Sequence, residues 1–227
     1  FDGHAFVVEA LARGACGALV SDEAALGAQS KNGIIVDDTL RALQSLAQYI
    51  RRVSDACVVA ITGSVGKTTT KELVAAVLGA RYRVCRSRGN LNNEIGLPLS
   101  LLELRTRPEV AVVELGMNSS GEISRLVEIS EPDVRVWLNV AEVHREFFSS
   151  IEEIADAKAE ILEGATSKTT VVANAADSRV MARLSGFPGS IATFGFDAGA
   201  SVSASEIEDR GLDGTRALLQ TPVGSTT

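Results

Sequence analysis

The sequence predicts an α/β protein of the P-loop type, with a mostly parallel sheet flanked by helices. From Cys57 onward, strand-like runs alternate with helical segments, which is the pattern of successive βαβ units. The run VAVVEL at 110–115 is apolar along almost its whole length, as expected when helices cover both faces of a sheet. A glycine-containing turn also joins the first of these strands to a helix that begins with a lysine and three threonines.

A smaller helix–strand alternation precedes this pattern. Within residues 1–38 we expect a helix over 5–15, a strand at 18–20, a short helix over 24–29 and a strand at 34–36. These elements are too few to close a core of their own. We therefore interpret them as the C-terminal part of a small N-terminal α/β domain.

An amphipathic helix is predicted over 39–53. Its apolar residues recur at helical spacing, and Thr39 or Asp38 can serve as the N-cap. The stripe consists of Leu40, Leu43, Leu46, Ala47 and Ile50. We expect residues 39–56 to connect the first domain to a central domain at 57–227.

The central domain follows a regular order. Strands are expected at 57–62, 82–86, 110–115, 134–140, 169–173 and 191–196. Helices are expected at 68–79, 94–104, 121–130, 151–165 and 178–185. Beyond residue 197, the runs 201–208 and 215–221 flank Gly211–Gly214 and predict an antiparallel hairpin.

Composition argues against several classes of protein. A net charge of −7 and an aromatic content of 4% argue against nucleic-acid binding. No apolar run approaches the length of a membrane span and no signal-peptide pattern is present, so we expect no membrane insertion and a cytoplasmic location. Cys16, Cys57 and Cys85 are far apart, which favours thiols in a reducing compartment. Because residue 1 is Phe and the chain stops just after a strand-like run, we expect a piece of a longer protein.

The segment Cys57–Thr70, CVVAITGSVGKTTT, carries the clearest chemical signal. Glycines let the backbone turn tightly, and the N–H groups of the turn and of the helix N-terminus form a cradle for phosphate. Lys67 can reach a terminal phosphate, and the hydroxyl of Thr68 or Thr69 can ligate Mg²⁺. Ile61 stands where a longer P-loop has glycine, so the form here is T-G-x-x-G-K-T. The predicted nucleotide-binding residues are Gly63, Ser64, Val65, Gly66, Lys67, Thr68 and Thr69. The alternative is a chance glycine turn.

Polar side chains follow neighbouring strands, at the edge where open parallel sheets bind ligands. Glu114 closes the strand at 110–115, where a nucleotide-bound Mg²⁺ needs an oxygen ligand. Asn92 and Asn93 lie in an amide-rich loop suited to orienting phosphates, and His144 follows the strand at 134–140. The simpler alternatives are an exposed acid, a capped turn and an inert loop histidine.

Lys158 lies on the apolar stripe of the predicted helix 151–165. It is three residues from Ala155 and Ile161 and four from Ile154 and Leu162. Burial lowers the pKa of an amine, and a neutral amine can react with CO₂ to form a carbamate that ligates a metal. The alternative is a lysine that snorkels from the edge of the stripe.

Several motifs together resemble the Mur ligase family, in particular its type that joins D-alanyl-D-alanine to UDP-N-acetylmuramoyl-tripeptide. They are TGSVGKTTTKE, GNLNNEIGLPLS, VVELGMN with GEI, NV with His144 four residues on, and AKAEI with NA. The opening, DGHAFV and ALARGACGALV, resembles the end of that family's UDP-sugar-binding domain. Two positions depart from the family's common residues, with Ala141 in place of glycine and Arg145 in place of leucine.

The resemblance implies an ATP-dependent amide ligase of peptidoglycan precursor synthesis. A substrate carboxylate takes the γ-phosphoryl group of ATP to give an acyl phosphate, and the amine of D-alanyl-D-alanine then displaces phosphate. It implies Lys67, His144 and Lys158 as catalytic residues and two Mg²⁺ ions served by Thr68, Glu114, His144 and a carbamylated Lys158. The C-terminal domain for the dipeptide would be absent from this chain, and we expect a monomer.

Three other functions fit part of the pattern. A related ligase could use a different amino acid or a folate substrate. A P-loop NTPase could use hydrolysis as a switch and would show ATPase activity without a UDP-sugar acceptor. An inactive fragment could also bind nucleotide weakly or not at all.

Overall fold

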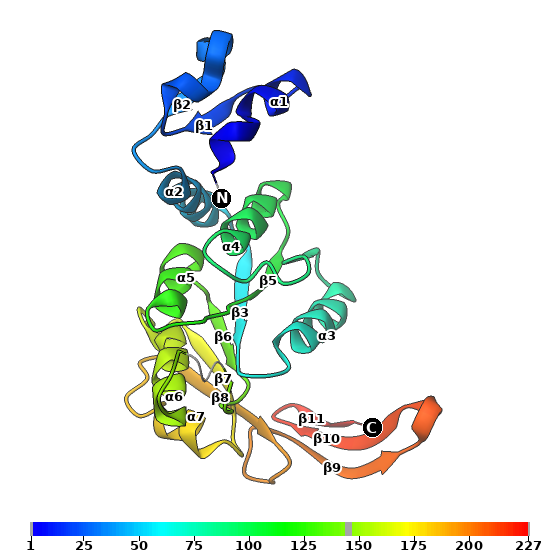
Figure 1. Cartoon of the computed structure of the whole chain (residues 1–227). Coiled ribbons are helices and arrows are strands. Elements are labelled where there is room, and N and C mark those ends of the chain that lie inside the picture. The colour runs from blue at the N-terminus through cyan, green and yellow to red at the C-terminus, as the bar shows by residue number, and fades with distance from the viewer. Residues whose placement is uncertain (1, 144–146, 227) are drawn as a thin grey trace. The chain divides into compact units, whose positions relative to one another are not determined.

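The computed structural model describes residues 2–143 and 147–226 (Figure 1). It divides into two compact units, one up to Leu46 and one from Ala47. The predicted α/β class is confirmed, because parallel strands and helices alternate through most of the second unit.

The first unit is a small α/β layer. A 3₁₀ turn at Gly3–Phe6 leads into α1 (Val7–Ala12), so the predicted helix over 5–15 is shorter and less regular than expected. β1 (Ala18–Val20) pairs in parallel with β2 (Gly33–Ile35), and a 3₁₀ segment at Glu23–Asn32 connects them. Val7, Leu11, Val20 and Leu26 form the core of this unit.

Helix α2 (Thr39–Val53) has the predicted bounds. The Asp38 Oδ1 atom accepts the Arg41 N–H at 2.9 Å, so Asp38 is the side chain that caps its first turn. The division between the two compact units falls inside α2, since Ala47 and Ile50 pack into the core of the second unit.

The second unit is built on one sheet, which has nine strands among the described residues. Its order is β11-β10-β9-β8-β7-β6-β3-β5-β4. Pairing is parallel from β4 across to β9, and antiparallel between β9 and β10 and between β10 and β11. The strands are β3 (Cys57–Thr62), β4 (Val84–Arg86), β5 (Val110–Glu114), β6 (Val134–Trp137), β7 (Thr170–Asn174), β8 (Ser190–Gly195), β9 (Val202–Asp209), β10 (Thr215–Thr221) and β11 (Gly224–Thr226). Strand β11 was not predicted.

Helices cover the two faces unequally (Figure 1). α3 packs with the smaller core around Val59, Ile61 and Val112. The larger core, on the opposite face, includes residues of α2, α4, α5, α6 and α7. These helices are α3 (Lys67–Gly79), α4 (Gly96–Leu101), α5 (Glu122–Ser130), α6 (Ile151–Ala159) and α7 (Ser178–Ala182).

Several predicted elements end earlier than expected. β6 stops at Trp137 instead of residue 140, because residues 139–141 turn aside to bond the loop after β3. The helix expected at 94–104 is α4 followed by a 3₁₀ segment at Leu102–Thr106. The helix expected at 151–165 is α6 followed by a 3₁₀ turn at Glu160–Leu162. No helix within the described parts of the chain has the length and apolar character needed to cross a bilayer.

Candidate functional site

The loop between β3 and α3 is shaped by two glycines. Gly66 has a φ of 83°, a left-handed conformation that a side chain disfavours, and α3 begins at the next residue. A Cβ on Gly63 would lie 2.9 Å from the Leu138 Cβ. The loop can therefore pass close to the end of β6 only because residue 63 has no side chain.

Lys67 folds back over this loop. Its Nζ donates to the Gly63 carbonyl at 2.8 Å. Burial lowers the pKa of Lys67, while the negative charge of Glu114 acts in the opposite direction. The amino group of Lys67 therefore lies over the turn where a terminal phosphate would enter.

Glu114 is the buried carboxylate of the site. It is 2% exposed and lies at the end of β5, next to β3 in the sheet. Thr68 Oγ1 donates to its Oε2 at 2.9 Å, and Asn92 Nδ2 donates to its Oε1 at 2.8 Å. A Cβ on Gly116 would lie 2.8 Å from the Asn92 Cγ, so this glycine lets the amide reach the carboxylate. The structure thus brings together three residues predicted from separate motifs.

Asn92 and Asn93 are adjacent, but their side chains make different hydrogen bonds. Asn92 contacts Glu114, whereas the Asn93 Oδ1 accepts the N–H groups of Ile95 and Gly96 at the start of α4. The Asn93 carboxamide oxygen therefore stabilises the turn locally. The sequence pattern did not distinguish the two amides.

Lys158 is buried, as its place on the apolar stripe predicted. It is 2% exposed, and burial together with the charge of Lys67 lowers its pKa to about 7. Among the described residues, its ammonium makes no hydrogen bond and no ion pair. Lys158 is thus an amine that is partly neutral near neutral pH and faces the same site as Lys67.

The remaining predicted residue, His144, lies outside the described residues, as does Arg145. Within 2–143 and 147–226, no group of three His, Cys, Asp or Glu side chains is arranged to hold a metal ion. The Thr68 hydroxyl, the Glu114 carboxylate and a nucleotide's phosphate oxygens are donors of the kind that Mg²⁺ prefers.

Sequence reasoning missed two sets of contacts. Lys71 is fully buried, and its Nζ donates to the Gly89 carbonyl at 2.8 Å, which ties α3 to the loop before Asn92. Ser64 and Val65 are bonded to residues 139 and 141. The sequence signal was weak in both cases, because a lysine one turn after Lys67 and an asparagine after a strand are common.

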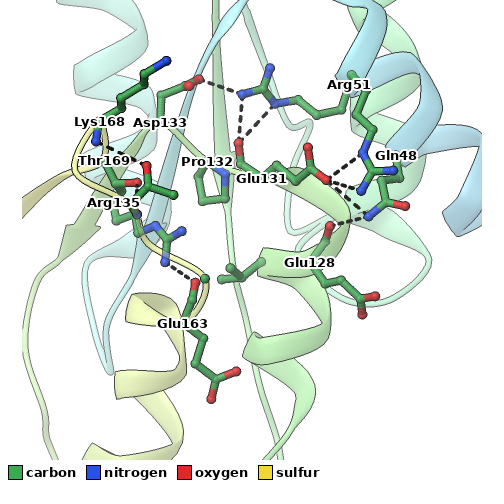
Figure 2. A pocket seen from close by; sticks show the side chains of 14 residues that line it. Gln48, Arg51, Glu128, Glu131, Pro132, Asp133, Arg135, Glu163, Lys168 and Thr169 are labelled. Carbon is green, nitrogen blue, oxygen red and sulfur yellow. Dashed lines mark hydrogen bonds and ion pairs between the residues drawn. The ribbon is translucent and has the colours of Figure 1, made fainter. Parts of the chain in front are cut away.

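A separate cavity of about 680 Å³ lies at the amino ends of β6 and β7, at the other end of the strands from the site described above (Figure 2). Its charged side chains are largely matched to each other or to main-chain groups: Arg51 pairs with Asp133 at 2.8 Å, and Arg52 pairs with Glu131 at 2.6 Å. Arg135 is 3% exposed. Its guanidinium donates to the carbonyls of Ile161 and Glu163, in and just after the 3₁₀ turn that follows α6. We interpret this cavity as part of the packing between α2, the end of α5 and the segment 163–169.

Comparisons with known proteins agree with this geometry. The model of the Mur ligase middle domain matches residues 61–226. The chain is 42% identical over 177 residues to the UDP-N-acetylmuramoyl-tripeptide–D-alanyl-D-alanine ligase of Rickettsia prowazekii, covering 78% of this chain and 39% of that protein. It is 38% identical over 228 residues to the ligase of the same name from Escherichia coli, covering 99% and 49%.

A solved structure extends the likeness to the fold. The MurF ligase of Thermotoga maritima in complex with ADP superposes with a TM-score of 0.87 at 30% identity, covering 100% of this chain and 52% of that one. The chain spans about half the length, or less, of these relatives. With the middle-domain model matched over most of the chain, this protein belongs to the Mur ligase family.

Proposed function

We propose that this chain is the nucleotide-binding part of an ATP-dependent ligase that joins D-alanyl-D-alanine to UDP-N-acetylmuramoyl-tripeptide. The observation that carries the proposal is the convergence of Lys67, Thr68, Glu114, Asn92 and Lys158 at the carboxyl ends of β3 and β5. The substrates are those of the ligases to which the chain is similar, and the ADP complex of the Thermotoga maritima protein supports ATP. The ligase would work in peptidoglycan precursor synthesis in the cytoplasm, as a monomer.

The reaction would proceed in two displacements. A carboxylate oxygen of the tripeptide attacks the γ-phosphorus of ATP, and the bond to ADP breaks. The amine of the dipeptide then attacks the acyl carbon, phosphate leaves, and the amine loses its proton. Catalysis of this kind depends on positioning and on neutralising charge, and it needs no protein nucleophile.

The chain's residues have distinct roles in this scheme. The N–H groups at the start of α3 bind phosphate oxygens, and Lys67 moves from the Gly63 carbonyl to the transferring phosphoryl group. Thr68 and Glu114 are oxygen donors, and no ion pair among the described residues neutralises the buried Glu114 carboxylate. This donor set fits Mg²⁺, which would neutralise charge on the phosphates when bound. His144 is proposed as a further ligand.

We also propose that Lys158 becomes carbamylated. Its neutral amine would attack CO₂, form the N–C bond and release a proton, and the product would be an anion in place of a cation. The burial of Lys158, its pKa of about 7 and its lack of a partner among the described residues support this. The anion would relieve repulsion with Lys67 and offer oxygen atoms to a second Mg²⁺.

The ligase assignment is tested by ADP release in the full-length gene product. Release should require both UDP-N-acetylmuramoyl-tripeptide and D-alanyl-D-alanine, and Lys67→Ala should abolish it. Exposed Lys168→Ala is the matched control and should leave the rate unchanged. Release that is independent of the tripeptide would instead indicate an NTPase. Carbon-13 bicarbonate should give a carbamate NMR signal in the native protein that is absent in Lys158→Met.

A further inference from the structure

The loop that follows β3 is bonded to the segment that follows β6. Val65 N–H donates to the Asn139 Oδ1 at 3.0 Å, and the Asn139 Nδ2 donates to the Val65 carbonyl at 3.1 Å. The Ser64 N–H donates to the Asn139 carbonyl at 3.1 Å. The carboxamide of Asn139 therefore bonds both main-chain groups of Val65, and the main-chain carbonyl of Asn139 bonds Ser64.

Ser64 completes the connection from the other side. Its Oγ accepts the Ala141 N–H at 2.8 Å and donates to the Ala141 carbonyl at 3.1 Å. Only main-chain atoms of Ala141 take part, so the methyl group at this position is compatible with the contact. Together, these five hydrogen bonds between residues 64–65 and 139–141 form what we call the loop clamp.

The clamp leaves only some of the loop's main-chain N–H groups free to bind a ligand. Those of Ser64 and Val65 are already donated to Asn139. Those of residues 66–69 have no acceptor among the described residues, as expected for the first turn of a helix. A phosphate would therefore be held by residues 66–69, with 64–65 serving as the fixed support.

Residues 138–141 of the clamp are themselves held by hydrogen bonds to the end of β7 and the start of α7. The Asn174 Nδ2 donates to the Leu138 carbonyl at 2.9 Å, and the Val140 N–H donates to the Asp177 Oδ2 at 2.7 Å. Residues 138–141 are thus held by β7 and α7 on one side and bond the phosphate loop on the other.

We propose that Asn139 is a positioning residue that holds the phosphate loop in its nucleotide-binding form by bonding both backbone groups of Val65. It does not contact the phosphates itself. The inference deepens the proposed function, since it concerns binding of the same nucleotide. A substitution at Asn139 would release the Val65 N–H and carbonyl, and the free loop would lose conformational order on which phosphate binding depends.

The test compares Asn139→Ala with Ser130→Ala in the 227-residue chain. Each variant removes a side chain that donates to a main-chain carbonyl, that of Val65 for Asn139 and that of Leu126 for the buried Ser130, but only Asn139 reaches the phosphate loop. Affinity for ADP is measured by calorimetry, hydrogen exchange of the Val65 amide by NMR, and folding by the thermal midpoint. We expect Asn139→Ala to weaken ADP binding about tenfold and to speed Val65 exchange at least about tenfold, which are changes of roughly 1.4 kcal/mol each.

The outcomes separate the two proposals. Ser130→Ala should keep the ADP affinity and Val65 protection of the wild type even if its thermal midpoint falls. Equal losses in both variants would reduce Asn139 to a general structural residue, and an unprotected Val65 amide in the wild type would disprove the clamp. If the wild-type chain binds no ADP, the nucleotide assignment fails, while Val65 exchange still decides whether the clamp exists.

Discussion

At the scale of single residues, the site depends on charges that are buried before any ligand arrives. Lys158 is an amine 2% exposed to solvent whose protonated form is repelled by the charge of Lys67, and Glu114 is a carboxylate 2% exposed to solvent. Each such group costs folding free energy unless it is compensated. Charges of this kind are typical of sites where function requires them.

The stability cost of Lys158 should depend on pH. Its folded pKa of about 7 lies below the ordinary value of 10.5. Between these values the unfolded chain binds more protons, so the wild-type free energy of unfolding rises with pH, and below about pH 7 the full penalty applies. Lys158→Met should therefore be more stable than the wild type at about pH 6, by up to a few kcal/mol at roughly 1.4 kcal/mol per pKa unit. Its advantage should shrink as the pH rises towards about 10.

This prediction is measured by urea unfolding in CO₂-free buffer across that pH range. Lys168→Met is the matched control, because Lys168 is exposed and its removal should not change the pH dependence. A constant difference between Lys158→Met and the wild type at all pH values would contradict the buried-amine interpretation.

Glu114→Gln tests the carboxylate. The amide oxygen can still accept a hydrogen bond from Thr68 or Asn92, but the negative charge is lost. ADP affinity measured with Mg²⁺ present should fall about tenfold or more, since a charge-assisted contact is worth about 1.5–3 kcal/mol. Affinity measured in excess chelator should change little. Glu122→Gln, at the first residue of α5, is the control. A loss of affinity in Glu114→Gln that is independent of Mg²⁺ would exclude the metal role.

At the scale of elements, helix ends determine where the functional side chains lie. Ser150 caps α6 by accepting the Glu153 N–H at 3.2 Å, and the helix then carries Lys158 into the core. Asp177 caps α7 with one carboxylate oxygen and holds Val140 with the other. The caps thus orient the site as well as stabilise their helices.

Ser150→Ala should destabilise the chain by about 1 kcal/mol, because the first turn of α6 loses its side-chain acceptor. Chemical unfolding gives the value. In Ser178→Ala, an exposed serine just inside α7 is removed, and the stability should change by less than about 0.5 kcal/mol. Equal effects of the two substitutions would show that the cap contributes nothing specific.

At the scale of the whole molecule, the division into units runs through α2. Ala47 and Ile50 belong to the core of the second unit. Arg51 Nε donates to the Ser130 carbonyl at 2.9 Å, and its Nη2 contacts the Asp133 carboxylate at 2.8 Å. The second half of this helix is therefore part of the second unit.

Truncation tests this boundary. A chain that begins at Thr39 should unfold cooperatively and bind ADP like the complete 227-residue chain. One that begins at Ala56 should lose about 3 kcal/mol or more, because buried apolar surface and the hydrogen bonds of Arg51 are removed together. Urea midpoints and ADP titrations give the comparison. Equal stability of the two truncated chains would place the boundary at the end of α2.

Local pattern was enough to predict most of the helices and strands of the second unit, although not β11. The alternation of strands and helices, the P-loop, and the polar residues at the strand ends all depend on neighbours within a few positions. The burial of Lys158 was also predictable, because helical spacing places it on an apolar stripe. Element ends were less predictable, since β6 stops where residues 139–141 find tertiary partners.

The sequence by itself determined the α/β class, the phosphate loop and the family resemblance. Only the tertiary structure decided that β6 lies beside β3, that Asn92 rather than Asn93 reaches Glu114, and that Asn139 bonds Val65. The physical reason is that these contacts join residues far apart along the chain. Their partners depend on strand order and on how the helices pack, and neither is encoded in local hydrophobic periodicity.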